Sequence, residues 1–147
     1  MEGPGKLLLV DDETDFADTL VKRLGKRGMD AAARYSGGAA LDYLAENPVD
    51  VVVLDVKMPG MDGIDCLRKI KERFPLVEVV LLTGHASLDV AISGMELGAF
   101  DYLMKPADVD ELRYKIEDAL NRKRLAERRI AREKEKLKSM GEGKASA

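Results

Sequence analysis

The sequence contains few aromatic residues and almost no cysteine or histidine: among 147 residues there is one cysteine, one histidine and no tryptophan. A single cysteine, Cys66, excludes a disulfide within the chain, and its apolar neighbours predict a small core residue rather than a reactive thiol. A single histidine, His85, provides no zinc-ligand spacing, so we expect an exposed loop side chain there.

Long apolar runs are also missing. No window approaches the roughly 18 apolar residues of a membrane span, and the first residues lack the apolar stretch of a signal peptide. We therefore expect a soluble, cytoplasmic protein. The 147 residues are enough for one domain with its own core and a short appendage.

Charge is divided unevenly along the chain. Residues 1–120 carry 14 basic and 23 acidic side chains, whereas residues 121–147 carry 10 basic and 4 acidic ones. An acidic domain with a basic tail argues against a nucleic-acid footprint over the whole domain. We expect a folded domain over residues 1–121 and a basic helical extension or linker with a flexible end over residues 122–147.

Strand-like and helix-like segments alternate regularly. Each of five short apolar runs is followed by a segment with helical periodicity. The five runs are residues 6–10, 29–34, 51–55, 78–83 and 101–105. Continuous apolar strands indicate a parallel sheet covered by helices on both faces. The expected fold class is therefore α/β, a doubly wound five-stranded parallel sheet with five helices, the last of them extended.

Acidic side chains stand at the ends of two of these runs. Asp11 and Asp12 follow the first run and Asp55 ends the third, so their carboxylates meet at one sheet edge if these strands are neighbours. Two like charges about 4 Å apart cost roughly 4 kcal/mol at an effective dielectric constant near 20, so the cluster must raise its pKa values or bind a cation. Oxygen ligands favour Mg²⁺, Mn²⁺ or Ca²⁺ over zinc.

Two further runs end in polar groups. Thr83 and Lys105 place a hydroxyl and an ammonium group at the same edge, where with a bound cation they form a receptor for a phosphoryl group. Asp55 stands alone on its strand and is the candidate nucleophile, whereas Asp11 and Asp12 are suited to hold metal. Each residue has a plainer interpretation alone, such as an acid preceding a helix. Their coincidence at four strand ends favours a site.

These motifs resemble the receiver domain of bacterial two-component response regulators, over roughly residues 5–120. The resemblance rests on Asp11-Asp12-Glu13, the segment 55–63, Thr83-Gly84, and Tyr102 with Lys105-Pro106. The segment from Leu82 to Pro106 is most similar to the receivers of AAA+ transcription activator regulators. The resemblance implies a flavodoxin-like sheet of strand order 2-1-3-4-5.

The resemblance also implies roles for particular residues. Asp55 would be the phosphoacceptor, with Thr83 and Lys105 as its catalytic partners. Mg²⁺ or Mn²⁺ would be held by Asp11, Asp12, Asp55 and the backbone carbonyl of Lys57.

Further implied features concern switching and the lifetime of the phosphorylated state. Thr83 and Tyr102 would form the switch, and the peptide bond between Lys105 and Pro106 would be cis. Lys57 and His85 would flank the phosphoryl site and tune the lifetime.

We expect a protein that accepts a phosphoryl group from the phosphohistidine of a sensor histidine kinase or phosphotransfer protein. It would catalyse only its own phosphorylation and dephosphorylation, and would switch the surface of the fourth helix, fifth strand and fifth helix. One alternative is a small Mg²⁺-dependent phosphohydrolase with an aspartate nucleophile, although Lys57 stands where such enzymes usually have a second acid. A receiver-shaped module that is never phosphorylated is disfavoured, because every expected site residue is present.

The tail leaves several accounts open. Residues 107–140 contain no glycine or proline, so the fifth helix is expected to run past the domain for about 50 Å. A 4-3 spacing selects positions 112, 116, 119, 123, 126, 130, 133, 137 and 140, seven of which are apolar. Three interpretations remain. The tail is a helix that forms a homodimer, together with the surface of the fourth helix, fifth strand and fifth helix. Otherwise it is a linker to an output domain, or a solvated charged helix. Direct nucleic-acid binding is not expected, because acids are interleaved.

Overall fold

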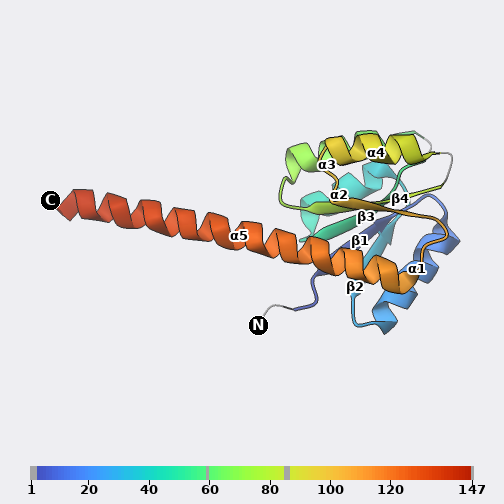
Figure 1. The fold of residues 1–147 in the computed structure, drawn as a ribbon, viewed down its shortest axis with the longest axis horizontal. Coiled ribbons are helices and arrows are strands. Elements are labelled where there is room, and N and C mark those ends of the chain that lie inside the picture. Colours follow the sequence, from blue (N-terminus) through green and yellow to red (C-terminus); the bar gives the residue numbers. More distant parts are fainter. Residues whose placement is uncertain (1–2, 59, 85–86, 147) are drawn as a thin grey trace.

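The computed structural model describes residues 3–58, 60–84 and 87–146, and none of the helices in these ranges is both long and apolar enough to span a bilayer. Strands and helices alternate along the whole chain (Figure 1). The strands are β1 (Lys6–Val10), β2 (Asp30–Arg34), β3 (Val51–Asp55), β4 (Glu78–Thr83) and β5 (Asp101–Met104). The helices are α1 (Thr14–Lys26), α2 (Gly37–Glu46), α3 (Gly63–Arg73), α4 (Leu88–Glu96) and α5 (Val109–Ser146).

The five strands form one parallel sheet of order β2-β1-β3-β4-β5. The expected fold class and strand order are confirmed. Two boundaries differ by one residue from the expected runs, since β2 begins at Asp30 and β5 ends at Met104. Met29 is instead the turn residue whose backbone N–H donates to the Leu24 carbonyl at the end of α1.

Helices cover both faces of the sheet, as Figure 1 shows. Successive side chains of a strand point to opposite faces. Leu7 and Leu9 of β1 therefore pack in a core with α1 and α5, whereas Leu8 and Val10 pack in a second core with α2, α3 and α4. Every residue of β3 and β4 is buried, which explains why residues 51–54 and 79–82 are continuously apolar.

The helix α5 has two parts with different surroundings. Its first turns pack on the sheet, where Leu112, Ile116 and Ala119 are completely buried. From residue 125 to residue 141 nearly every side chain is exposed, and Figure 1 shows this part running away from the body as a single helix. At 1.5 Å per residue the 38 residues of α5 span about 57 Å.

The 4-3 apolar spacing of α5 therefore serves two purposes. Positions 112, 116 and 119 belong to the core of the domain itself, so no partner helix can use them. Beyond the domain the same spacing continues with Ile130, Leu137 and Met140, which are exposed. The sequence of an apolar stripe does not show whether the sheet of the same chain or another molecule covers it, so the spacing alone does not separate the buried positions from the exposed ones.

The turn after β3 is held close to the strand by the start of α3. The carboxylate of Asp62 caps this helix by accepting the Asp65 backbone N–H at 2.8 Å. Gly63 donates its backbone N–H to the Val56 carbonyl at 2.9 Å, and a Cβ atom at position 63 would lie only 2.4 Å from the Asp55 carbonyl oxygen. Only glycine permits this contact, so α3 begins directly against the end of β3.

Candidate functional site

Three carboxylates meet at the C-terminal edge of the sheet, as the strand ends predict. Asp11 and Asp12 follow β1, Asp55 ends β3, and these two strands are neighbours. One carboxylate oxygen from each of the three aspartates lies within 4.8 Å of the others. Asp11 and Asp55 are buried, whereas Asp12 is exposed. The cluster thus opens to solvent on the side of Asp12.

Lys105 supplies the opposite charge. Its Nζ donates to Asp11 Oδ2 at 2.7 Å and lies 3.7 Å from Asp55 Oδ2 and 3.6 Å from Glu13 Oε1. The ammonium also lies 4.4 Å from the centre of the Phe16 ring, close enough for a cation–π contact. Burial disfavours the charge, but the hydrogen bond to Asp11 and the neighbouring carboxylates outweigh it, so the pKa of Lys105 is raised.

The surroundings of Asp55 change its pKa. Burial and the charge of Asp11 raise its pKa from 3.8 to about 6, while Lys105 and the Lys57 backbone N–H, 3.3 Å from Oδ1, lower it in part. One lysine therefore does not neutralise the cluster fully. A hard divalent cation with oxygen ligands fits this donor set of carboxylates, and Mg²⁺ and Mn²⁺ have that preference.

The other residues selected from the sequence lie at the same edge but differ in their contacts. Thr83 is fully buried, and its hydroxyl donates to the Gly84 carbonyl at 3.1 Å. The backbone N–H of Lys105 donates to the Thr83 carbonyl at 2.8 Å, so the ends of β4 and β5 are joined here. The Lys105–Pro106 peptide bond is cis.

Tyr102 belongs to the edge strand β5, two strands away from β3, which carries Asp55. It is half-buried on β5, packs against the core that contains α4, and lines a hollow of about 390 Å³ between β5 and α5. Lys57 is exposed. The assignment of His85 lies outside the described residues.

Sequence reasoning assigned no site role to Phe16 or Glu13. Phe16 reads as a core position of α1, and only the three-dimensional arrangement places its ring beneath Lys105. Glu13 immediately follows the two predicted metal ligands, and that adjacency is a signal from which its ion pair with Lys105 could have been anticipated. Both residues hold the ammonium in place.

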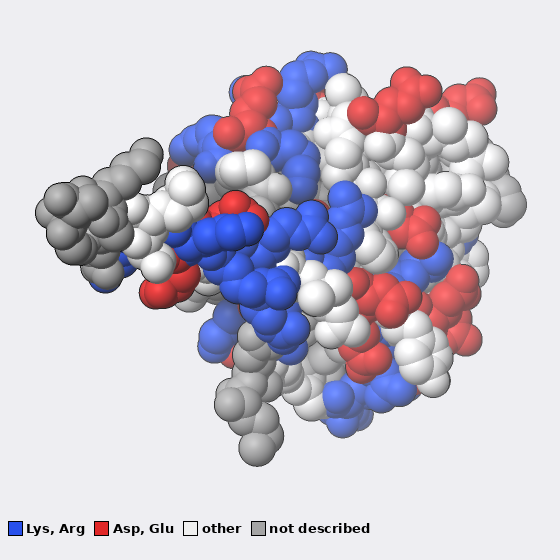
Figure 2. All heavy atoms as spheres, turned by 60° about the vertical axis from the view of Figure 1, so that its left-hand side comes forward, with Lys and Arg blue, Asp and Glu red and all other residues white. Residues whose placement is uncertain are grey.

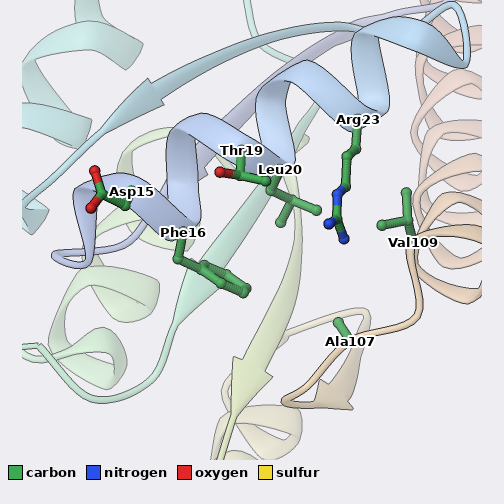
Figure 3. A pocket seen from close by; sticks show the side chains of 7 residues that line it. All are labelled: Asp15, Phe16, Thr19, Leu20, Arg23, Ala107 and Val109. Atoms are coloured by element: carbon green, nitrogen blue, oxygen red, sulfur yellow. The ribbon is translucent and has the colours of Figure 1, made fainter.

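A hollow of about 300 Å³ lies beside this site, between α1 and the segment after Lys105 (Figure 3). Phe16, Leu20 and Val109 give it an apolar surface, and Asp15 and Arg23 place charges at its ends. Because Phe16 lies under Lys105, this hollow adjoins the carboxylate cluster.

The fold and this site define a class of protein. A family model described as the response regulator receiver domain matches residues 7–117, and the chain belongs to this family of two-component signalling proteins. Members of this family are typically signalling phosphoacceptors rather than enzymes.

Particular relatives refine the comparison. The chain is 38% identical over 117 residues to the DNA-binding transcriptional regulator NtrC of Escherichia coli (strain K12), covering 80% of this chain and 25% of that one. It is 36% identical over 115 residues to the response regulator protein PilR of Pseudomonas aeruginosa, covering 78% and 26%. The chain thus spans about a quarter of the length of these relatives. The expected similarity to the receivers of transcription activators is confirmed.

Solved structures agree with these relatives. A receiver domain protein from Clostridium thermocellum superimposes with a TM-score of 0.79 at 39% identity, covering 83% of this chain and 98% of that one. NtrX from Brucella abortus superimposes with a TM-score of 0.80 at 30% identity, covering 86% and 29%.

Proposed function

We propose that this receiver accepts a phosphoryl group on Asp55 from the phosphohistidine of a sensor histidine kinase or a phosphotransfer protein. The observation that carries the proposal is the placement of Asp55: a buried carboxylate at the end of the central strand, beside two further aspartates and 3.7 Å from an ammonium group. An ionised oxygen held beside cationic and cation-binding groups is both nucleophile and receptor for a phosphoryl group.

The proposed reaction is an in-line displacement. A carboxylate oxygen of Asp55 forms a bond to phosphorus, the bond from phosphorus to the donor histidine nitrogen breaks, and its electron pair stays on the imidazole. Lys105 pairs with a phosphoryl oxygen. A divalent cation held by Asp11, Asp12, Asp55 and the Lys57 carbonyl would neutralise the charge that gathers on the phosphoryl oxygens. Water later attacks the phosphorus of the acyl phosphate, the bond between phosphorus and the Asp55 oxygen breaks, and inorganic phosphate leaves while the Asp55 carboxylate is restored.

The hollow in Figure 3 supports docking of the donor on α1. It is partly apolar, it adjoins Lys105, and charges of both signs stand at its ends. A helix that carries the phosphohistidine would cover Phe16 and Leu20 and thereby bring its imidazole toward Asp55.

The added phosphoryl charge would act through Thr83 and Tyr102. In the present structure the Thr83 hydroxyl donates to the Gly84 carbonyl, so it is available to exchange this partner for a phosphoryl oxygen. Movement of Thr83 would make room for Tyr102 and bias the surface formed by α4, β5 and α5. Reversal of a 1:99 equilibrium requires a preference of about 5.5 kcal/mol for the active state.

We also propose that two copies associate through the α4, β5 and α5 surface and the exposed stripe of α5. Val90 and Ile92 of α4 and Tyr114 of α5 are exposed apolar side chains of the two helices that border this surface. Ile130 and Leu137 continue the 4-3 spacing of α5 beyond the domain, with 40% and 67% of their surface exposed. A second copy would cover both.

The test of phosphoacceptance is mass spectrometry of the chain after incubation with acetyl phosphate and Mg²⁺. The wild-type chain is expected to gain one phosphoryl group, and Asp55→Asn to gain none, because an amide is not a nucleophile for this reaction. Asp42→Asn removes an exposed carboxylate of α2 and is expected to behave like the wild type. An adduct that persists in Asp55→Asn would refute the assignment. Turnover of a small phosphorylated substrate beyond one equivalent would instead favour the phosphohydrolase.

A further inference from the structure

The edge of the sheet opposite the carboxylate cluster holds a second group of charged side chains. The Asp50 carboxylate, just before β3, accepts the Lys6 backbone N–H at 2.8 Å and the Lys123 ammonium at 2.6 Å. The backbone N–H of Asp50 donates to the Lys6 carbonyl at 2.8 Å, and its carbonyl accepts from the Glu78 N–H at 3.1 Å. Asp50 thus joins the first residues of β1, β3 and β4 to α5.

Three consecutive cations of α5 reach three different parts of the domain. Arg122 Nε lies 3.1 Å from Glu78 Oε2 at the start of β4. Lys123 binds Asp50, and the Arg124 guanidinium donates to the backbone carbonyl of Gly3. Successive residues of a helix point about 100° apart, so the three side chains spread over more than half of its circumference. We name Asp50, Glu78, Arg122, Lys123 and Arg124 the ionic clasp.

The acidic members of the clasp are shielded from solvent. The side chains of Glu78 and Asp50 are 7% and 24% exposed, and that of Lys123 is 12% exposed. Burial alone would raise the pKa of Asp50, but Lys123 and the Lys6 backbone N–H outweigh it and lower this pKa. The central pair therefore stays ionised at neutral pH, and salt screens it less than it would screen an exposed pair.

The clasp stands where α5 leaves the body. Leu120, two residues before Arg122, is the last buried side chain of the helix among the described residues. A Cβ atom on Gly5, whose φ is +88°, would lie 2.9 Å from a Leu120 methyl carbon and 3.3 Å from Asp50 Oδ2, so backbone, leucine and clasp are tightly packed. Figure 2 shows lysine and arginine side chains gathered around this root of the extension.

We propose that the ionic clasp fixes the direction of the exposed part of α5 relative to the receiver. Apart from the clasp, the helix beyond Leu120 meets the domain at Leu76, which lines a hollow together with Ile130 and Lys134. Leu76 and Ile130 stay 37% and 40% exposed, so this open hollow would not hold the helix by itself, and without the clasp the helix would bend at the domain edge. With cations holding several sides of the helix, residues 125–141 move as one rigid body with the sheet. A displacement of the packed turns of α5 is then carried to the end of the extension.

The test measures one distance between spin labels on cysteines introduced at Glu46, an exposed residue at the end of α2, and at Ser139 on the extension. The native Cys66 is buried, which raises the pKa of its thiol to about 11, so we expect the spin label to react with it much more slowly than with the two exposed cysteines. We expect a narrow distance distribution in the parent chain. Lys123→Met and Asp50→Asn are both expected to broaden it and shift its maximum, whereas Lys123→Arg retains the narrow distribution.

Lys138→Met is the matched control, because it removes the same charge from an exposed position on the same helix. Its distribution is expected to stay narrow. Distributions as narrow as the parent's in both clasp variants would overturn the proposal, and so would equal broadening in the control. Thermal melting followed by circular dichroism completes the test. Loss of cooperative melting in both clasp variants would show that the clasp holds the domain together, which also overturns the proposal.

Discussion

At the scale of single residues, burial and electrostatic repulsion at Asp55 lower the stability of the folded chain. Its carboxyl is buried beside Asp11, and the single ammonium of Lys105 compensates only in part. A carboxyl whose pKa rises from 3.8 to about 6 on folding costs the folded state about 3 kcal/mol once it is ionised. The site is thus stabilised by what binds to it.

A pH dependence follows for the metal-free chain. Protonation of Asp55 removes its unfavourable charge from the folded state. This contribution to stability is therefore fully present below about pH 4 and is lost as the pH rises through about 6. We therefore expect Asp55→Asn to unfold at higher urea concentration than the wild type at pH 8 in the presence of a chelator, by up to about 3 kcal/mol. The difference should shrink toward zero as the pH falls to about 4.

Two controls accompany this measurement. Asp42→Asn changes an exposed acid and should leave the free energy of unfolding within about 0.5 kcal/mol of the wild type. Mg²⁺ should stabilise the wild type more than Asp55→Asn at pH 8. A gain in Asp55→Asn that is the same at both pH values would speak against repulsion as its cause.

At the scale of elements, the contact between α3 and β3 is set by one glycine. Gly63→Ala would place a methyl group 2.4 Å from the Asp55 carbonyl oxygen and 2.6 Å from the Val56 Cα, and both of these atoms belong to backbone. We expect a loss of about 1–3 kcal/mol in the free energy of unfolding, measured with urea. The added methyl group would also displace the end of β3, which carries Asp55, so the affinity for Mg²⁺, measured by calorimetry, should fall too.

Gly38→Ala is the control for this substitution. Gly38 is exposed within α2, and nothing lies within 4 Å of the position of its added methyl group. Because Gly38 stands in the first turn of α2, an alanine there should change the free energy of unfolding by no more than about 0.5 kcal/mol. Similar effects of the two alanines would contradict the close contact at Gly63.

At the scale of the whole molecule, the exposed stripe of α5 predicts self-association. The sedimentation coefficient should rise with concentration, and more strongly with beryllofluoride bound as a phosphoryl mimic. Replacement of Ile130 and Leu137 by glutamate should keep the chain monomeric, because charge is then placed in the apolar stripe. Leu125→Glu alters an exposed leucine that lies off the stripe and should not affect association. A wild-type monomer under both conditions would eliminate the dimer.

The sequence allows the architecture and most of the site to be predicted, because both depend on local patterns. Four apolar runs predict the strands, and the polar side chains at or just after their ends predict the site; these are Asp11, Asp55, Thr83 and Lys105. Contacts between distant side chains follow no such pattern. The ring of Phe16 under Lys105 depends on how α1 crosses the sheet.

The ionic clasp illustrates the same limit. Lys123 interrupts an apolar spacing and reads as a weakness of a coiled coil. The structure pairs it with Asp50, which lies 73 residues earlier in the chain. The ion pair with Asp50 explains why a charged residue stands at position 123, and the sequence alone does not reveal this contact.

The continuity of α5 from the core to its exposed end has a geometric consequence. Each residue turns a helix by about 100°, so the azimuth of Leu137 around the helix axis is set by Leu112 and Ile116, which are locked in the core. One inserted residue between Leu125 and Ile130 would rotate everything beyond it by about 100°, whereas seven would restore the original phase to within about 20°. The number of residues in the extension, and not only their chemistry, thus decides which way its far end faces.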